Sequence, residues 1–169
     1  MTKVLITGAA GAVGSSLLRE LAQAEGSPYE VLATDIRAPE NLPAGIRFEP
    51  LDVRGDDPGR LIGQERPDVV IHLASIVAPT TRDFAHGVDV VGSRNVLAAC
   101  VAHGVKRLVV TSSGAAYGYH ADNAQPLIES DPLRGNRAFA YSDHKRQVEE
   151  MLATARAETP ALEQVVLIV

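Results

Sequence analysis

The sequence predicts an α/β protein with a doubly wound parallel sheet between two layers of helices, a three-layer α/β/α arrangement. Short apolar runs that suit strands alternate with longer helical patterns, which is the order of right-handed βαβ units. The composition agrees, because 46% of the 169 residues are hydrophobic while only four Tyr, three Phe and no Trp are present. A core of Val, Leu, Ile and Ala is typical of a parallel sheet covered by helices.

The expected elements follow one another along a single domain, residues 1–169. The predicted strands are Lys3–Thr7, Glu30–Thr34, Ile46–Glu49, Val69–Leu73, Arg107–Thr111 and Gln164–Val169. The predicted helices are Gly14–Ala24, a short one near Pro58–Glu65, Asp83–His103 and Ala140–Ala157. A long loop from Tyr117 to Arg137 separates two of these elements, and a connection of that length in a compact domain is usually functional.

The last apolar run, Val165 to Val169, reads as a fully buried strand in which the sequence stops. A natural domain rarely ends on such a strand, because the missing continuation should carry the chain out to solvent. We therefore expect that a C-terminal portion is absent from this sequence.

Charge and composition exclude several classes of function. The net charge of −5 disfavours nucleic acid or an anionic membrane surface as a partner. No apolar run approaches the ~20 residues that span a bilayer, and no secretory signal precedes the first strand, so the cytoplasm is the expected compartment. The single cysteine, Cys100, lies in an apolar helical stretch and is expected to be a buried core residue. We expect no metal site.

A glycine-rich turn joins the first strand to the first helix and predicts a dinucleotide site. Such a turn presents free backbone N–H groups at the positive end of a helix, where a pyrophosphate binds. Gly8 suits the tight turn, Gly11 leaves room for the pyrophosphate and Gly14 allows close packing of the helix. The contacting residues are expected to be Gly8, Ala10, Gly11, Ala12, Val13 and Gly14. The glycines lie three apart rather than in the usual G-x-G-x-x-G spacing, and three glycines after a strand can also form only a tight turn.

An acidic residue at the end of the second strand indicates which dinucleotide is bound. Asp35 follows Gly14 at about the ~20-residue offset at which a carboxylate accepts hydrogen bonds from the adenosine ribose. It would repel the 2′-phosphate of NADP, so NAD is favoured. Arg37, two residues on, could partly offset that repulsion, and NADP stays open as the lesser alternative. We include Ile36 among the cofactor contacts.

Two further strand ends are expected to reach the cofactor. Asp52 can accept from the adenine amino group while Val53 packs on the ring. The end of the fourth strand carries small residues that would let the cofactor lie against the backbone beside the nicotinamide half. The expected contacts there are Leu73, Ala74 and Ser75. His72, at the same strand end, is interpreted as a hydrogen-bonded core histidine rather than a catalytic group.

Tyr141 and Lys145 stand four residues apart on a predicted helix and therefore share a face. A nearby ammonium stabilises the phenolate. The pKa of the phenol therefore falls from its ordinary value of ~10, and the tyrosine becomes a usable base. Ser113, just after a strand, can hydrogen-bond the reacting substrate oxygen, although it could equally satisfy the local backbone. Ser112 is the alternative serine. The candidate cofactor contacts also include Ser112, Tyr141 and Lys145.

These motifs in this order resemble the extended short-chain dehydrogenase/reductase family, in its NAD-dependent epimerase/dehydratase branch. The segments that carry the resemblance are Thr7–Gly14, Asp35, Asp52–Val53, His72–Ala74, Ser112–Gly118 and Tyr141–Lys145. The resemblance implies that Tyr141 is the catalytic base, that Lys145 also binds the nicotinamide ribose, that Ser113 contacts the substrate hydroxyl, and that NAD is tightly held.

The sequence also departs from the family pattern. Asp89 stands where the family commonly has Asn, and Ala12–Val13 replace an aromatic–aliphatic pair. Family members run to roughly twice this length, and their C-terminal part supplies most substrate contacts.

Hydride transfer to NAD with Tyr141 as base would give a keto intermediate, which epimerases, dehydratases and dehydrogenases use differently. The expected substrate is a nucleotide sugar, by analogy alone. A sugar or sugar-acid dehydrogenase is the first alternative. A dinucleotide-binding regulatory module without catalysis and a short-chain reductase of a small carbonyl compound are further alternatives. The resemblance implies a homodimer contact through the outer faces of helices Asp83–His103 and Ala140–Ala157. The alternative is that the apolar stripes of these helices only pack on the sheet.

Overall fold

A computed structural model describes residues 1–24 and 26–169 and folds this part of the chain around a six-stranded sheet. Every neighbouring pair of strands is parallel, and the order across the sheet is β3-β2-β1-β4-β5-β6. The strands are β1 (Thr2–Thr7), β2 (Tyr29–Asp35), β3 (Arg47–Pro50), β4 (Val69–His72), β5 (Arg107–Ser112) and β6 (Glu163–Ile168).

The chain starts in the middle of the sheet and reverses its winding direction once. It runs outward from β1 through β2 to β3, then returns and adds β4, β5 and β6 on the other side of β1. The connections that leave the carboxyl ends of β1 and β4 therefore diverge, and in open α/β sheets a ligand crevice lies at this point. The doubly wound parallel sheet expected from the sequence is confirmed.

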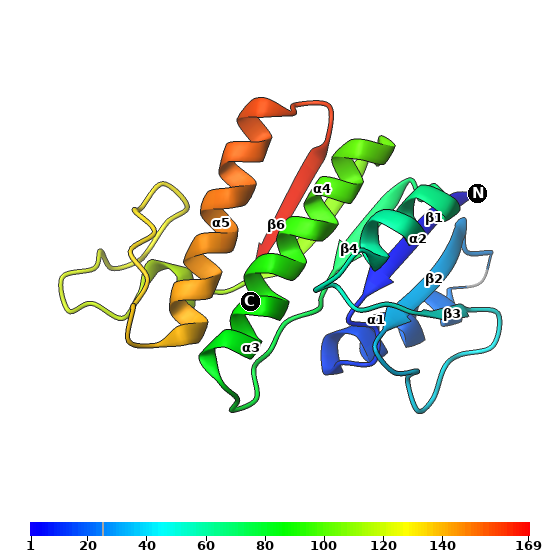
Figure 1. Cartoon of the computed structure of the whole chain (residues 1–169), viewed down its shortest axis with the longest axis horizontal. Coiled ribbons are helices and arrows are strands. Elements are labelled where there is room, and N and C mark those ends of the chain that lie inside the picture. The colour runs from blue at the N-terminus through cyan, green and yellow to red at the C-terminus, as the bar shows by residue number, and fades with distance from the viewer. Residues whose placement is uncertain (25) are drawn as a thin grey trace.

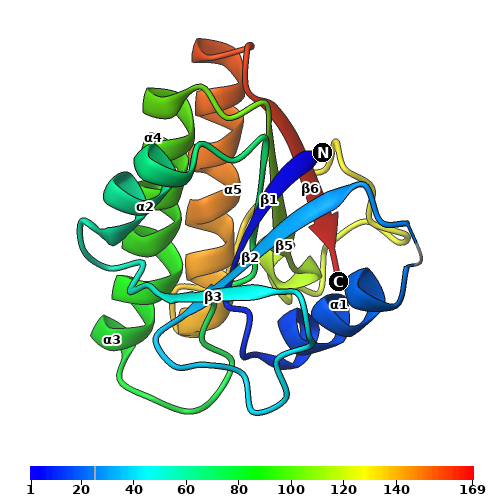
Figure 2. The ribbon, with the colours of Figure 1, turned by 90° about the vertical axis from the view of Figure 1, so that its right-hand side faces the viewer.

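Helices cover the two faces unequally. On one face lie α2 (Asp57–Glu65), α4 (Ser93–His103) and α5 (Ala140–Glu158), with α4 and α5 side by side (Figure 1). The opposite face carries α1 (Ala12–Gln23), the only helix on that side within the described residues (Figure 2). This follows from right-handed crossovers, because the β1–β2 crossover and the crossovers after β3 run in opposite directions across the sheet.

The strands alternate their side chains between two apolar cores. Leu5 of β1 points into the larger core under α2, α4 and α5, whereas Val4 and Ile6 point into the smaller one under α1. Cys100 lies in the larger core and is fully buried, as expected, and burial raises the pKa of its thiol to about 12. The chain thus builds its core largely from aliphatic side chains.

The expected helix Asp83–His103 is a composite of three pieces. It begins as α3 (Arg82–His86), widens into a π-helical turn over Gly87–Gly92 and continues as α4. Gly92 permits the close approach of this turn to the segment after β3, because a Cβ there would lie 2.5 Å from Cγ2 of Val53. Single π-helical turns inside α-helices occur frequently at functional sites.

The long loop after β5 is held to the body of the protein at its neck. A short 3₁₀ turn, Gly114–Tyr117, is followed by irregular chain up to α5. The Gly135 N–H donates to the carbonyl of Ala116 (3.0 Å), and the Tyr119 N–H donates to Oδ1 of Asn136 (2.7 Å). These bonds return the chain to the sheet edge just before α5 begins.

The last strand is not buried in the way its apolar sequence suggests. β6 stands at the edge of the sheet, paired with β5, and Leu167 and Ile168 are 47% and 45% exposed. The expectation of a fully buried strand was wrong, because an apolar run does not distinguish a central strand from an edge strand.

Candidate active site

The glycine-rich turn between β1 and α1 has the tight geometry that its sequence predicts. Gly8 has a φ of +70°, and a Cβ there would lie 2.5 Å from the backbone nitrogen of Ala74. At Gly14 a Cβ would lie 2.4 Å from the carbonyl oxygen of Gly8, so α1 packs directly on the turn. At both positions a side chain would displace backbone.

Gly11 leaves the start of α1 open to a ligand. Its backbone is extended (φ −72°, ψ 173°), and the helix begins at Ala12, two residues before the expected start. A Cβ on Gly11 would meet only the Gly8 carbonyl oxygen, at 3.2 Å. Having no side chain, Gly11 cannot cap the first N–H groups of the helix, which therefore remain available to an anion.

Asp35 links the end of β2 to this turn. Its Oδ2 accepts a hydrogen bond from the backbone N–H of Ala10 (3.0 Å), and the carboxylate also lines the neighbouring cleft. One oxygen thus fixes the turn, while the carboxylate retains acceptor capacity for a ligand hydroxyl.

A cleft of about 150 Å³ runs along the carboxyl edge of the sheet at the winding reversal. It brings together nine of the predicted cofactor contacts from four segments of the chain. They are Gly8, Gly11, Asp35, Ile36, Asp52, Val53, Leu73, Ala74 and Ser75. Ala10, Ala12 and Arg37 instead line an adjoining open hollow on the outer side of the turn, and Val13 is 56% exposed.

Five residues that were not among the predicted contacts also line the cleft: Leu51, Arg54, Ile76, Phe84 and Val88. Arg54 forms a close pair with Asp52, with Nη2 to Oδ2 at 2.6 Å and Nε to Oδ1 at 3.0 Å. The hydrogen bond from Arg54 lowers the pKa of Asp52. The Arg54 guanidinium also lies 5.0 Å from the centroid of the Phe84 ring, so a cation on an aromatic face forms part of the cleft lining.

His72 lies below the cleft in a buried network. Its Nδ1 is 2.7 Å from Oγ1 of Thr7, and its Nε2 is 3.0 Å from Oγ of Ser93. Burial lowers the pKa of His72 to about 3, and the charge of Lys145 acts in the same direction. The interpretation of His72 as a hydrogen-bonded core histidine is confirmed.

Tyr141 and Lys145 lie one turn apart on α5, and the Lys145 Nζ is 5.6 Å from the centroid of the Tyr141 ring. Lys145 is buried and donates to the carbonyl oxygen of Thr111 (3.1 Å). Burial lowers the pKa of Lys145, whereas the charges of Asp89 and Glu149 oppose that shift. The lysine ammonium thus lies over the tyrosine ring, as their shared helix face predicts.

The two candidate serines differ in environment. Ser113 is half-buried, and its Oγ accepts from the backbone N–H of Ala115 (3.3 Å) at the start of the 3₁₀ turn. Ser112 is 1% exposed, and its Oγ has no hydrogen-bond partner within the described residues. Of the two, Ser113 is the more accessible, but its catalytic role stays a prediction.

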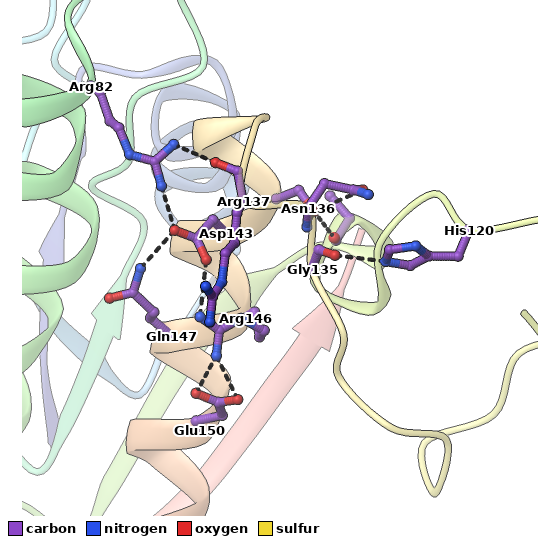
Figure 3. Close-up of polar contacts among 11 residues, drawn as sticks. Arg82, His120, Gly135, Asn136, Arg137, Asp143, Arg146, Gln147 and Glu150 are labelled. Atoms are coloured by element: carbon purple, nitrogen blue, oxygen red, sulfur yellow. Dashed lines mark hydrogen bonds and ion pairs between the residues drawn. The ribbon is translucent and has the colours of Figure 1, made fainter.

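A polar cluster fixes the first turns of α5, which carry Tyr141 and Lys145 (Figure 3). Asp143 Oδ2 accepts from Arg82 of α3, and its Oδ1 accepts from Arg146 (2.9 Å). Arg82 also donates to the carbonyl oxygen of Arg137 at the end of the long loop (2.8 Å). Burial would raise the pKa of Asp143, but the hydrogen bond from Arg146 and the nearby guanidinium charges hold it below its usual value.

Among the described residues, no three His, Cys, Asp or Glu side chains gather in a way that could hold a metal ion. In the same part of the chain, no helix has both the length and the apolar character to cross a bilayer.

The fold and the cleft define a dinucleotide-binding α/β domain of the dehydrogenase type. The glycine turn and the acidic end of β2 line the cleft, and Lys145 lines a neighbouring pocket that shares Ala74 and Ser75 with it. The chain belongs to the NAD-dependent epimerase/dehydratase family, whose profile matches residues 4–169. This confirms the family that the sequence motifs resemble, and with it NAD as the family's cofactor.

Curated relatives of known activity carry out different reactions. UDP-glucose 4-epimerase of Mus musculus is 32% identical over 94% of this chain and 50% of its own length. The decarboxylating sterol-4-alpha-carboxylate 3-dehydrogenase of Schizosaccharomyces pombe is 30% identical over 94% of this chain and 47% of its own length. Family membership therefore does not select the substrate.

A solved structure of a relative has the same fold. UDP-glucose 4-epimerase of Thermus thermophilus, in complex with NAD, superimposes with a TM-score of 0.85 at 30% identity. That match covers 99% of this chain and 54% of the other. The chain spans about half the length of the relatives that it matches, in agreement with the expectation that members of the family are longer.

Proposed function

We propose that this chain is the NAD-binding domain, residues 1–169, of an epimerase or dehydratase that acts on a nucleotide sugar, with Tyr141 as its base. The observation that supports the proposal is that the glycine turn and Asp35 line one cleft, while Lys145 lines a neighbouring pocket that shares Ala74 and Ser75 with that cleft. Relatives that act on UDP-glucose support the substrate class.

The residues of the cleft fit NAD. The open start of α1 would bind the pyrophosphate, and Asp35 would accept from the adenosine ribose. Val53 and the Asp52–Arg54 pair would border the adenine, while Ala74 and Ser75 would lie beside the nicotinamide half. When bound, NAD supplies the hydride acceptor.

The protein's own part in the reaction is proton transfer and orientation. Lys145 holds a positive charge beside the Tyr141 ring, which favours the phenolate, and Tyr141 Oη takes the proton from a sugar hydroxyl. Ser113 Oγ would hold that hydroxyl in place. Oxidation at the same carbon gives a keto sugar, which the enzyme reduces on the other face or from which it eliminates water.

Replacement of Tyr141 tests this role. Tyr141→Phe should lower turnover of UDP-glucose by about 10²–10⁴-fold, the usual contribution of a general base, with NAD affinity nearly unchanged. Tyr119→Phe is the matched control, because Tyr119 is 70% exposed and lies in the long loop. Turnover by Tyr141→Phe at the wild-type rate would remove Tyr141 from the mechanism, and a wild-type chain that fails to bind NAD would refute the proposed function altogether.

A dehydrogenase of the same family is the second candidate, favoured by the sterol dehydrogenase relative. It would release its keto product together with NADH, so accumulation of NADH during turnover separates it from an epimerase.

We further propose a homodimer through the outer faces of α4 and α5, and a cytoplasmic location. Light scattering that gives a monomer across micromolar concentrations would rule out the dimer.

A further inference from the structure

Two buried titratable side chains lie against each other behind the cleft without forming a hydrogen bond. Asp89, on the π-helical turn, is 3% exposed, and His144, on α5, is fully buried. The Asp89 Oδ2 and the His144 Nδ1 are 3.5 Å apart. Neither atom has a hydrogen-bond partner within the described residues, and neither has the His144 Nε2. A buried carboxylate oxygen without a hydrogen-bond partner requires a compensating charge nearby.

The other oxygen of Asp89 is committed to the cleft. Its Oδ1 accepts from Oγ of Ser75 (2.9 Å) and from the backbone N–H of Ile76 (2.9 Å). Ser75 and Ile76 both line the cleft, where Ser75 is a predicted contact of the nicotinamide half. The carboxylate therefore fixes the segment after β4 to the π-helical turn.

Asp89 and Lys145 line the same small polar pocket. The hydrogen bond of Lys145 to Thr111 involves a neutral carbonyl, so it brings no counter-charge. The charges of Asp89 and Glu149 favour the protonated lysine against the effect of burial. Asp89 thus lies between α5, which carries Lys145, and the cofactor cleft, with one oxygen toward the cleft.

The other charged groups around Asp89 and Lys145 do not balance the charge of Asp89. His144 faces Asp89 from α5, His86 packs edge-on against His144 with ring centroids 5.4 Å apart, and Arg82 adds positive charge from α3. Arg82 is bound to Asp143, as described above. Burial lowers the pKa of His144, and the charge of Asp89 opposes that shift. Lys145 lines the same pocket as Asp89, so we take it as the cation that pairs with the carboxylate.

We propose that Asp89 is a positioning residue whose carboxylate holds Lys145 in its charged form and couples that charge to the Ser75–Ile76 segment of the cofactor cleft. The proposal rests on the proposed role of Lys145 beside Tyr141. An amide at position 89 could keep the two hydrogen bonds of Oδ1 but could not balance the lysine. The two functions of the carboxylate can therefore be separated by one substitution.

The test is a direct titration of Lys145. The chain has three lysines, Lys3, Lys106 and Lys145, so lysine labelled with ¹³C at Cε gives a small set of NMR signals. In Asp89→Asn the pKa of Lys145 should fall by about 1 pH unit or more relative to wild type, as expected for loss of an opposite charge in a buried site. The alkaline limit of NAD affinity should move to lower pH by a similar amount.

Two further variants serve as controls. Asp83→Asn removes the same charge from an exposed position on α3 and should leave both titrations unchanged. Asp89→Glu keeps the charge and should restore much of the Lys145 pKa. An unchanged Lys145 titration in folded Asp89→Asn would overturn the proposal, as would a Glu149→Gln variant that accounts for the whole effect.

If Asp89→Asn does not fold, the wild-type protein still decides the question. The ¹³Cγ signal of Asp89 should show an inflection at the alkaline pH where Lys145 loses its proton, and its absence would overturn the proposal. This coupling is measured without NAD. A chain that shows the coupling but does not bind NAD would contradict the proposed function, whereas one that binds NAD without the coupling would contradict only the role of Asp89.

Discussion

Thr7 and His72 stand opposite each other on β1 and β4, with Thr7 Oγ1 2.7 Å from His72 Nδ1. Oγ of Ser93 donates its only proton to the carbonyl oxygen of Asp89, so His72 Nε2 must be the donor to Ser93. Nδ1 then accepts from Thr7, and the ring is neutral. A proton on Nδ1 would replace this acceptor with a second donor in a buried site.

Stability should therefore fall as the solution becomes acidic. Burial lowers the pKa of His72 from 6.5 to about 3, so between these values the unfolded state binds a proton that the folded state does not. The stabilisation is complete above pH 6.5 and is lost below it, by as much as about 1.4 kcal/mol per pH unit. Urea unfolding at pH 7, 6 and 5 measures the effect.

His72→Gln should flatten that dependence, although it also loses stability at neutral pH. His103→Gln, outside the Thr7–His72–Ser93 network, should retain the wild-type slope. His144 contributes in the same direction, because burial lowers its pKa as well. Equal slopes in wild type and His72→Gln would show that His72 does not resist protonation in the folded state.

Gly8→Ala should abolish NAD binding. The new methyl group would lie 2.5 Å from the backbone nitrogen of Ala74, and the residue would have to adopt a φ of +70°. The turn must shift, so we expect a loss of stability above about 1 kcal/mol and no measurable affinity for NAD. Calorimetric titration and thermal unfolding measure the two effects.

Gly59→Ala is the matched control for this substitution. Gly59 lies within α2, and a Cβ there meets nothing within 4 Å. This change should preserve NAD binding and raise stability by roughly 0.5–1 kcal/mol, the usual difference between Ala and Gly inside a helix. Wild-type affinity in Gly8→Ala would contradict a role for the turn in cofactor binding.

The sequence predicted the parts of the site that short segments encode. The turn around Gly8, the position of Asp35 after β2 and the spacing of Tyr141 and Lys145 each depend on one strand end or one helix, so a local pattern suffices. The structure then places Gly8 and Asp35 on the cleft and Lys145 in the neighbouring pocket.

Tertiary packing decided what the sequence did not predict. Phe84 lies far from Arg54 in the sequence, and only the packing of α3 beside the segment after β3 brings them into contact. The apolar pattern in the sequence does not reveal a π-helical turn, so periodicity gave no sign that Asp89 would face His144. The edge position of β6 depends on sheet order, which an apolar run does not encode.

Asp35→Asn should weaken NAD binding and reduce discrimination against NADP. The amide can still accept from the Ala10 N–H, so the turn is kept, but the charge that attracts the ribose hydroxyls is lost. A charge-assisted hydrogen bond contributes about 1.5–3 kcal/mol, which corresponds to a loss of roughly 10–150-fold in NAD affinity. The affinity for NADP should rise, because Arg37 is then no longer opposed by the carboxylate.

The double variant Asp35→Asn/Arg37→Ala separates the two contributions. It should lose the gain in NADP affinity while retaining the weakened binding of NAD. Titration of both dinucleotides against each variant gives the comparison. An unchanged ratio of the two affinities in Asp35→Asn would indicate that Asp35 serves only to hold the turn.

Arg82→Ala should loosen the helix that carries Tyr141. Arg82 joins α3 to Asp143 and to the Arg137 carbonyl, so its loss frees the loop end just before α5 (Figure 3). Because Arg82 is 46% exposed and Arg146 still pairs with Asp143, the stability cost should not exceed about 1 kcal/mol. Amide hydrogen exchange should accelerate over the first turns of α5, and turnover should fall more than NAD affinity does. Arg60→Ala is the control, because it breaks the exposed Arg60–Asp57 pair on α2 and should alter neither the exchange over α5 nor turnover. Unchanged exchange over α5 in Arg82→Ala would show that the helix is held without the contacts of Arg82.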